Sequence, residues 1–206
     1  MEYFLEDGAD YRYSAVSLET APEETAVSIA TVKGHLNLTR PDHDAWIGNA
    51  IVAAERYAEG YTNRQLVEAA YDVYFDRFPQ PGGVIELPKP PLSEIASIKY
   101  IDDTTGTLTT WDSSEYVVDI VSERGRVWEQ DDFSWPTPRI IRHAVVIRMT
   151  CGYSDAASVP LEISQALLLL IGHWFSNREA AVGFSVTEIP FGVNALLDHY
   201  VSERFF

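Results

Sequence analysis

Residues 160–179, PLEISQALLLLIGHWFSNRE, are the stretch of sequence that decides the fold. Apolar residues recur there at three- and four-residue spacing, which predicts a helix of about five turns, roughly 30 Å long. Leu168, Leu169 and Phe175 extend the apolar surface beyond the main face of this helix. A helix that is apolar nearly all round is buried on more than one side. We therefore expect the rest of the fold, or a partner subunit, to pack around it.

The composition of the chain limits the classes of protein to which it can belong. It has 206 residues, a formal net charge of -16 and one cysteine, Cys151, which excludes a disulfide framework and a cysteine-based zinc site. The acidic balance argues against a sequence-independent grip on nucleic acid, which needs lysine and arginine against phosphate, but is compatible with an acidic channel for DNA. No signal peptide or membrane-spanning segment is apparent, so we expect a protein assembled in the cytoplasm and no membrane partner.

Further helices flank this central one, and their ends carry local signals. They are predicted at 27–36, 39–63 and 190–200. Ser28 is the expected N-cap of the first, and Thr39 opens the second with Asp42 as its capping-box partner. Asn63 is expected to end the second helix, and Ser158 is the expected N-cap of the central helix.

The segment between the second and central helices has the pattern of β-structure. Short runs rich in valine, isoleucine and aromatic residues alternate with turn residues, and 102–106 has the composition of a hairpin turn. These runs predict a compact antiparallel sheet or a small barrel. The expected strands are 66–78, 84–87, 95–101, 108–111, 116–120, 126–128 and 143–151.

The order of elements predicts an α+β fold. We expect a mainly helical bundle, formed by two N-terminal and two C-terminal helices, with an antiparallel β-region inserted between helices two and three. Residues 1–26 are acidic and rich in tyrosine, and we expect a poorly ordered lead-in or an arm that wraps a neighbouring subunit. The bundle would comprise residues 27–64 and 155–201, the β-rich insertion 65–154, and a tail 202–206.

No group of residues has the arrangement of a catalytic or metal site. Glu129, Asp131 and Asp132 could be taken for hydrolase carboxylates, but in so acidic a chain a solvated loop is the default interpretation. His43 lies between two aspartates in a predicted first helical turn, where carboxylates suit the helix dipole. Cys151 lies within a predicted strand and has no partner in sequence. We expect no enzyme activity, no metal and no cofactor.

Aromatic residues of the β-region allow a second interpretation. Trp111, Trp128 and Trp135 could form a platform for a sugar or a peptide, although such residues more often serve as core or interface anchors. The alternative to a structural protein is therefore a sugar- or peptide-binding module.

Segments in all parts of the chain resemble one known family. The segments AIVAAERYAEGYTNRQL (50–66), IELPKPPLSEIASIKYID (85–102), VPLEISQALLLLIGHWFSNREA (159–180) and IPFGVNALLDHY (189–200) occur in this order. Their order and spacing are similar to those of the head–tail connector (adaptor) proteins of tailed phages and phage-like gene transfer agents. The resemblance extends over roughly residues 27–200.

The resemblance implies a non-enzymatic virion protein at the head–tail junction. Such adaptors form a ring, usually of twelve copies, that binds the portal, extends the DNA channel and presents a platform to a tail-side completion (stopper) protein. DNA would pass without sequence-specific binding. The tail residues Arg204, Phe205 and Phe206 would dock onto the portal.

Contacts between copies in such a ring need apolar surface that the single chain leaves open. We expect this surface to lie on the central helix, at Leu168, Leu169, Phe175 and Arg178.

Overall fold

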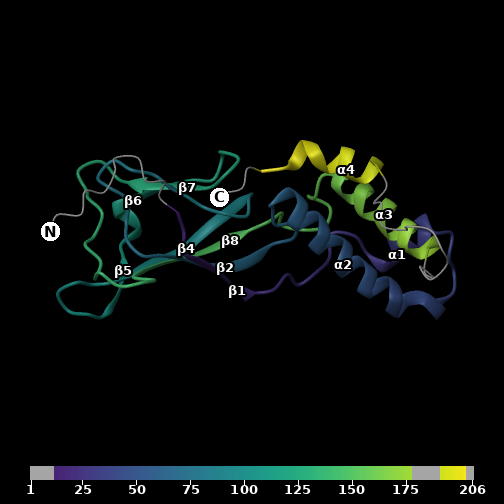
Figure 1. Cartoon of the computed structure of the whole chain (residues 1–206), viewed down its shortest axis with the longest axis horizontal. Coiled ribbons are helices and arrows are strands. Elements are labelled where there is room, and N and C mark those ends of the chain that lie inside the picture. Colours follow the sequence, from purple (N-terminus) through teal and green to yellow (C-terminus); the bar gives the residue numbers. More distant parts are fainter. Residues whose placement is uncertain (1–11, 178–190, 203–206) are drawn as a thin grey trace, which may run out of the picture.

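Helices and strands gather at opposite ends of an elongated molecule in the computed structural model of the chain (Figure 1). The structure describes residues 12–177 and 191–202. Helices and antiparallel sheets together confirm the α+β class. The expectation of a mainly helical chain is not confirmed, because strands are about as common as helices. The reason is that the helices are shorter than predicted, and that β1 adds a strand from outside the predicted β-insertion.

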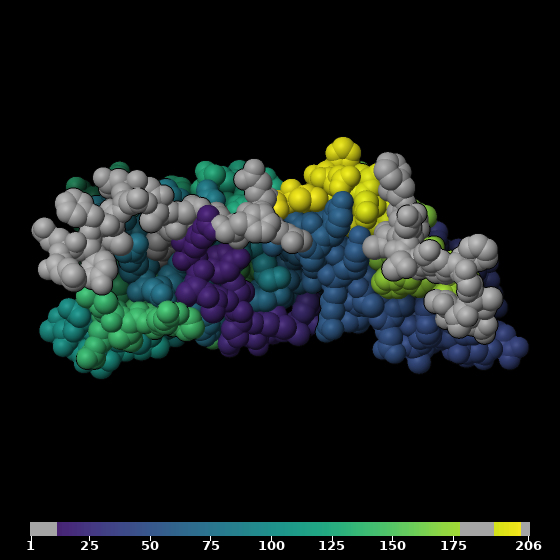
Figure 2. Space-filling view, in the orientation of Figure 1, coloured from purple at the N-terminus to yellow at the C-terminus, as the bar shows by residue number. Residues whose placement is uncertain are grey.

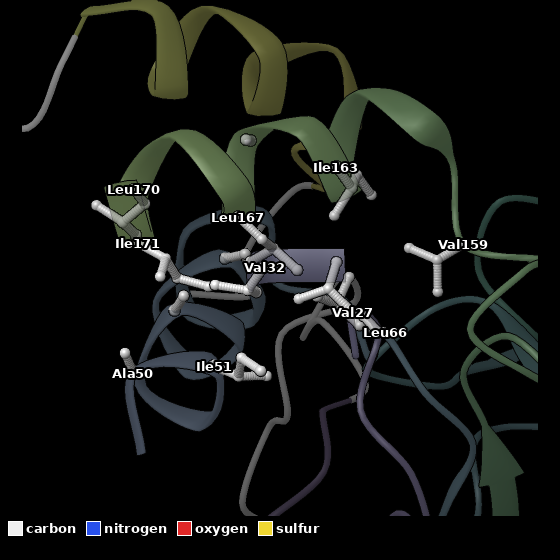
Figure 3. Packing of buried hydrophobic residues seen from close by; sticks show 14 of the residues in the cluster. Val27, Val32, Ala50, Ile51, Leu66, Val159, Ile163, Leu167, Leu170 and Ile171 are labelled. Carbon is white, nitrogen blue, oxygen red and sulfur yellow. The ribbon is translucent and has the colours of Figure 1, made fainter. Parts of the chain in front are cut away.

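The helical end is organised around the central helix, as the sequence predicts. Leu167 and Ile171 of this helix point toward Val32, with Ala50 and Ile51 close by (Figure 3). All five side chains are almost completely buried. The α-helices among the described residues are α1 (Ile29–His35), α2 (Asp44–Thr62), α3 (Leu161–Ser176) and α4 (Phe191–Leu197).

Two of the predicted helix ends are confirmed. The Ser28 hydroxyl accepts a hydrogen bond from the Thr31 N–H at 3.1 Å and so caps α1. Asn63 follows α2 with φ 56°, the left-handed conformation that commonly ends a helix.

Two predicted helix starts are wrong. Residues Pro41–His43 form a 3-10 turn, and α2 begins only at Asp44 instead of after Thr39. The N-cap of α3 is Pro160 rather than Ser158, and no side chain caps it. The residue before a proline is pushed out of the α-helical conformation, so a helix that reaches Pro160 cannot begin any earlier.

The β-end consists of two antiparallel sheets rather than one sheet or barrel (Figure 1). The larger sheet has the strand order β1-β2-β8-β4-β5, and the smaller one has the order β3-β7-β6. The strands are β1 (Ala15–Thr20), β2 (Ala69–Phe75), β3 (Ile85–Glu86), β4 (Leu92–Ile101), β5 (Leu108–Trp111), β6 (Tyr116–Asp119), β7 (Arg126–Glu129) and β8 (Val145–Cys151).

β8 lies at the centre of the larger sheet, and its sequence alternates. Val145, Ile147, Met149 and Cys151 are fully buried on one face, whereas Arg148 is exposed on the other. This alternation has the two-residue period of a strand that covers a core. β8 pairs with both β2 and β4, so it joins the two halves of the sheet.

β1 corrects the interpretation of residues 1–26 as an arm without regular structure. Ala15–Thr20 pairs antiparallel with β2, and the register places Val16 opposite Val73. Backbone hydrogen bonds to a strand more than 50 residues away hold this segment, and such pairing leaves no local pattern in the sequence. Figure 2 shows this amino-terminal strand, in purple, on the surface of the molecule.

The two ends of the molecule have separate hydrophobic cores joined by polar contacts. The Gln65 side chain is 1% exposed, donates to Glu59 Oε1 at 2.7 Å and accepts from the Tyr71 hydroxyl at 2.7 Å. Glu59 belongs to α2 and Tyr71 to β2. A buried amide with both groups paired fixes how the helical end meets the sheet.

Candidate assembly surfaces

The last described residues of the chain are fastened to the junction between the helices and the sheets. The Ser202 N–H donates to the Thr62 carbonyl at 2.8 Å, and Arg124 Nε donates to the Ser202 hydroxyl at 3.2 Å. Ser202 is 1% exposed. The tail therefore starts from a fixed position, although the predicted docking residues Arg204, Phe205 and Phe206 lie outside the described residues.

A second group of hydrogen bonds holds residues 194–200, which precede the tail, against α2. Tyr57 and Tyr61 of α2 donate their hydroxyls to Asn194 and Asp198, at 2.9 and 2.5 Å. Arg64, just after α2, donates to the Tyr200 carbonyl and to the Glu123 carboxylate. Figure 2 shows α4, in yellow, on the molecular surface beside α2.

Arg64 and Arg124 are functional candidates that sequence reasoning missed. Arg64 follows the left-handed Asn63 directly. The only sequence feature that could have pointed to it is that a cation near the carboxyl end of a helix is favourable. Arg124 lies in a loop of the β-insertion, 78 residues before Ser202, and no local pattern links the two.

The side of α3 that carries Leu168 and Leu169 is partly exposed to solvent in the single chain. Leu168 and Leu169 are half-buried and pack against the helical core, whereas Leu167 and Leu170, which flank them in sequence, are buried. Part of the surface of Leu168 and Leu169 therefore stays exposed in the single chain.

Phe175 has a contact within its own chain that the sequence did not predict. Its ring meets Trp46 edge-on at 5.5 Å and His43 edge-on at 5.4 Å. Phe175 is half-buried as a result, so less of it remains for a subunit contact than expected. Arg178, the fourth predicted interface residue, lies outside the described residues.

Two of the three β-region tryptophans are part of an aromatic cluster. Trp135 stacks on Phe78 with ring centroids 5.1 Å apart, and Trp111 meets Phe78 edge-on at 5.7 Å. Trp111 is 4% exposed, and its Nε1–H donates to Glu115. Trp128 lies on β7 in the smaller sheet. The three rings do not form a common exposed platform, which removes the main support for a sugar-binding surface.

The acidic residues considered for hydrolysis have structural or solvated positions. Glu129 accepts backbone N–H groups from Gly82 at 2.9 Å and Trp135 at 3.2 Å. Asp131 and Asp132 are exposed in the loop that follows. In residues 12–177 and 191–202 no three histidine, cysteine or acidic side chains converge on a possible metal position.

Cys151 is a buried core residue, and burial raises the pKa of its thiol to about 12. At neutral pH it stays a thiol, which is a poor nucleophile. None of the helices in the described part of the chain has the length and apolarity needed to cross a membrane.

Glu55 has a perturbed pKa for a structural reason. Burial beside the helical core raises its pKa from 4.5 to about 7, against the lowering effect of the Ala26 N–H that donates to Glu55 Oε1. The neighbouring Glu59 raises it further. The bond fastens the segment before α1 to α2, so Glu55 acts on the stability of the helical end.

Comparisons with known proteins identify the family to which the chain is similar. A family model described as "Head completion protein" matches residues 25–189 of the chain. No curated protein matches it in sequence.

Solved structures share the fold over nearly the whole chain. The chain is similar to one in "Neck of empty GTA particle computed with C6 symmetry", with a TM-score of 0.73 at 20% identity. It is also similar to one in "Virion of native gene transfer agent (GTA) particle", with a TM-score of 0.72 at 22% identity. Each alignment covers 93% of this chain and 97% of the other. A third, "Neck of native GTA particle computed with C12 symmetry", has a TM-score of 0.69 at 21% identity.

Proposed function

The chain belongs to the head completion protein family, and from this we propose that it is a structural virion protein that joins the head to the tail. The family match over residues 25–189 is the observation that carries the proposal. The protein would act at the head–tail junction of a phage-like particle after assembly in the host cytoplasm.

We propose that copies of the chain form a ring, with twelve as the expected number. A ring needs two different lateral surfaces on each copy that fit one another. The partly open edges of Leu168 and Leu169 on α3 would supply part of one of them. Part of Phe175 and the neighbouring Arg178 would extend this contact.

The negative charge of the chain opposes assembly of such a ring. Each copy has a formal net charge of -16, so neighbouring copies repel one another at low ionic strength. At physiological ionic strength salt largely screens the repulsion between charges more than about 8 Å apart. Assembly should therefore be favoured by salt or by a preformed portal ring. The same charge would keep DNA from adhering to the channel wall and let it pass without sequence-specific binding.

Portal docking would use the tail, with Arg204, Phe205 and Phe206 as its contact residues. The tail begins at Ser202, which is held from both the helical end and the β-insertion. A short segment on a fixed base loses little conformational freedom on binding, which favours tight docking. The opposite end of the ring would present a platform to the stopper protein.

Particle assembly without the last two residues tests the docking role. Deletion of Phe205 and Phe206 is expected to leave the fold and its melting temperature unchanged while heads no longer acquire the protein. Electron microscopy of particles from cells that make this variant would measure attachment. Normal attachment of the shortened chain would contradict docking through the tail.

The ring contact has its own test, with a matched control on the same helix. Leu168→Arg places a charge at the proposed contact, and Leu161→Arg places one at a residue that is 82% exposed near the start of α3. Mass photometry and negative-stain images should show rings for the control and single copies for Leu168→Arg. Circular dichroism must show both variants folded, and rings formed by folded Leu168→Arg would exclude this face.

A further inference from the structure

A basic cleft lies at the carboxyl end of β2, the end of that strand farther from α2. It encloses about 780 Å³ and is lined by Arg12, Arg77, Arg139 and Arg142 among other residues. All four arginines are exposed at least in part. The one carboxylate in its lining, Asp76, accepts a hydrogen bond from the His143 N–H.

This cleft is an exception in a strongly acidic chain. The sequence has 31 acidic and 15 basic residues, and four of the basic ones meet at this position. Cations gathered around one hollow create a local positive potential that attracts an acidic ligand.

Apolar side chains in the same cleft favour a peptide ligand over a DNA backbone. Ile140 is 97% exposed and Ile141 is 43% exposed, and both line it. A DNA backbone would use the arginines and leave both isoleucines in water. A peptide that is both acidic and apolar would pair with the arginines and also cover the isoleucines.

A segment of this chain has that chemistry. Residues 2–11, EYFLEDGADY, carry four carboxylates and no lysine or arginine, together with the apolar run Tyr3-Phe4-Leu5. The segment is joined to Arg12, which is itself part of the cleft wall.

The sequence also offers a way for the segment to fold back. The dipeptide Asp7-Gly8 is a turn signal between the apolar run and Arg12. A tether this short gives an effective concentration in the millimolar range for the cleft of the same copy. This favours the same copy over a neighbour.

We propose that the basic cleft binds residues 2–11 of its own chain. The carboxylates of the segment face the arginines, and its apolar run covers Ile140 and Ile141. The contact is independent of ring formation, so it exists in the single copy in solution.

Disulfide trapping in the full chain tests the contact directly. Leu5→Cys and Ile140→Cys add two thiols to a chain whose natural cysteine, Cys151, is buried. Mild oxidation at low protein concentration should join them within one copy, which gives a faster-migrating monomer on a non-reducing gel. Thiols that stay free would overturn the proposal, and so would a product that consists of disulfide-linked dimers.

Charge reversal separates a specific contact from random collision. The pair Arg139→Glu and Arg142→Glu, added to the two cysteines, is expected to slow disulfide formation about tenfold, because two attractive ion pairs become repulsive contacts with the carboxylates of the segment. The pair Arg40→Glu and Arg56→Glu makes the same change of charge on α2 and the turn before it, and should have no effect.

Equal rates for the two charge-reversed pairs would overturn the proposal. So would binding of a short DNA duplex by the natural chain that is lost only in the cleft variant, because the cleft would then serve DNA.

Discussion

Replacing Glu55 by glutamine is expected to make the chain more stable at neutral pH. The natural carboxylate is partly buried on α2, and its pKa is raised from 4.5 to about 7 by that burial. Its Oε1 accepts the Ala26 N–H, which ties the segment before α1 to α2. Glutamine keeps an oxygen that can accept the same hydrogen bond and has no charge to bury.

The sign and size of the effect follow from the two pKa values. Between about pH 4.5 and 7 the folded chain holds a proton on Glu55 that the unfolded chain has lost. The free energy of unfolding therefore falls as pH rises through this window and stays at its lower value above it. The full difference corresponds to about 3 kcal/mol. Because the side chain keeps partial contact with water, we expect about 1–2 kcal/mol.

Urea denaturation from pH 4 to 8 measures this effect. Glu55→Gln should match the natural chain at pH 4 and exceed it in unfolding free energy by about 1–2 kcal/mol at pH 7.5. Glu68→Gln removes the same single charge from an exposed position and controls for the change in net charge. Equal gains for the two variants, or an unchanged pH dependence in Glu55→Gln, would refute the reasoning.

Other perturbations test the cores and their polar contacts. Leu170→Asp places an unpaired charge at a position that is 1% exposed and should unfold the chain in circular dichroism, whereas Leu161→Asp on the same helix should not. Arg148→Ala removes the bidentate partner of the buried Asp72 carboxylate and should lower the melting temperature, which the added change Asp72→Asn should largely restore. Cys151 should react with a thiol reagent at pH 7.5 only after urea unfolds the chain, because burial raises its pKa to about 12.

Elements with a strong local pattern could be predicted from the sequence. The apolar repeat of α3 and the alternation in β8 are both visible without any knowledge of partners. Both contribute to a core within the single chain, so a local pattern of buried residues is enough to define them.

The elements that sequence analysis missed depend on distant partners. β1 has the sequence AVSLET, in which the apolar alternation is too short to indicate a strand, and it is held by backbone bonds to β2. The contact of Phe175 with Trp46 joins residues that are far apart in the chain, and nothing near Phe175 points to it. The tail anchor is similar, because the bonds of Ser202 involve residues from two distant segments.

The position of the tail anchor has a mechanical consequence for a head–tail joint. Thr62 holds the Ser202 N–H from the end of α2, and Arg124 holds the Ser202 hydroxyl from the β-insertion. If the tail docks as proposed, a pull on it would be shared by both cores. The buried Gln65 also joins the helical end to the larger sheet, through hydrogen bonds to Glu59 of α2 and Tyr71 of β2. These bonds would resist separation of the two ends under such a pull. A tail fastened only to α4 would load a short helix that could detach while both cores stayed folded.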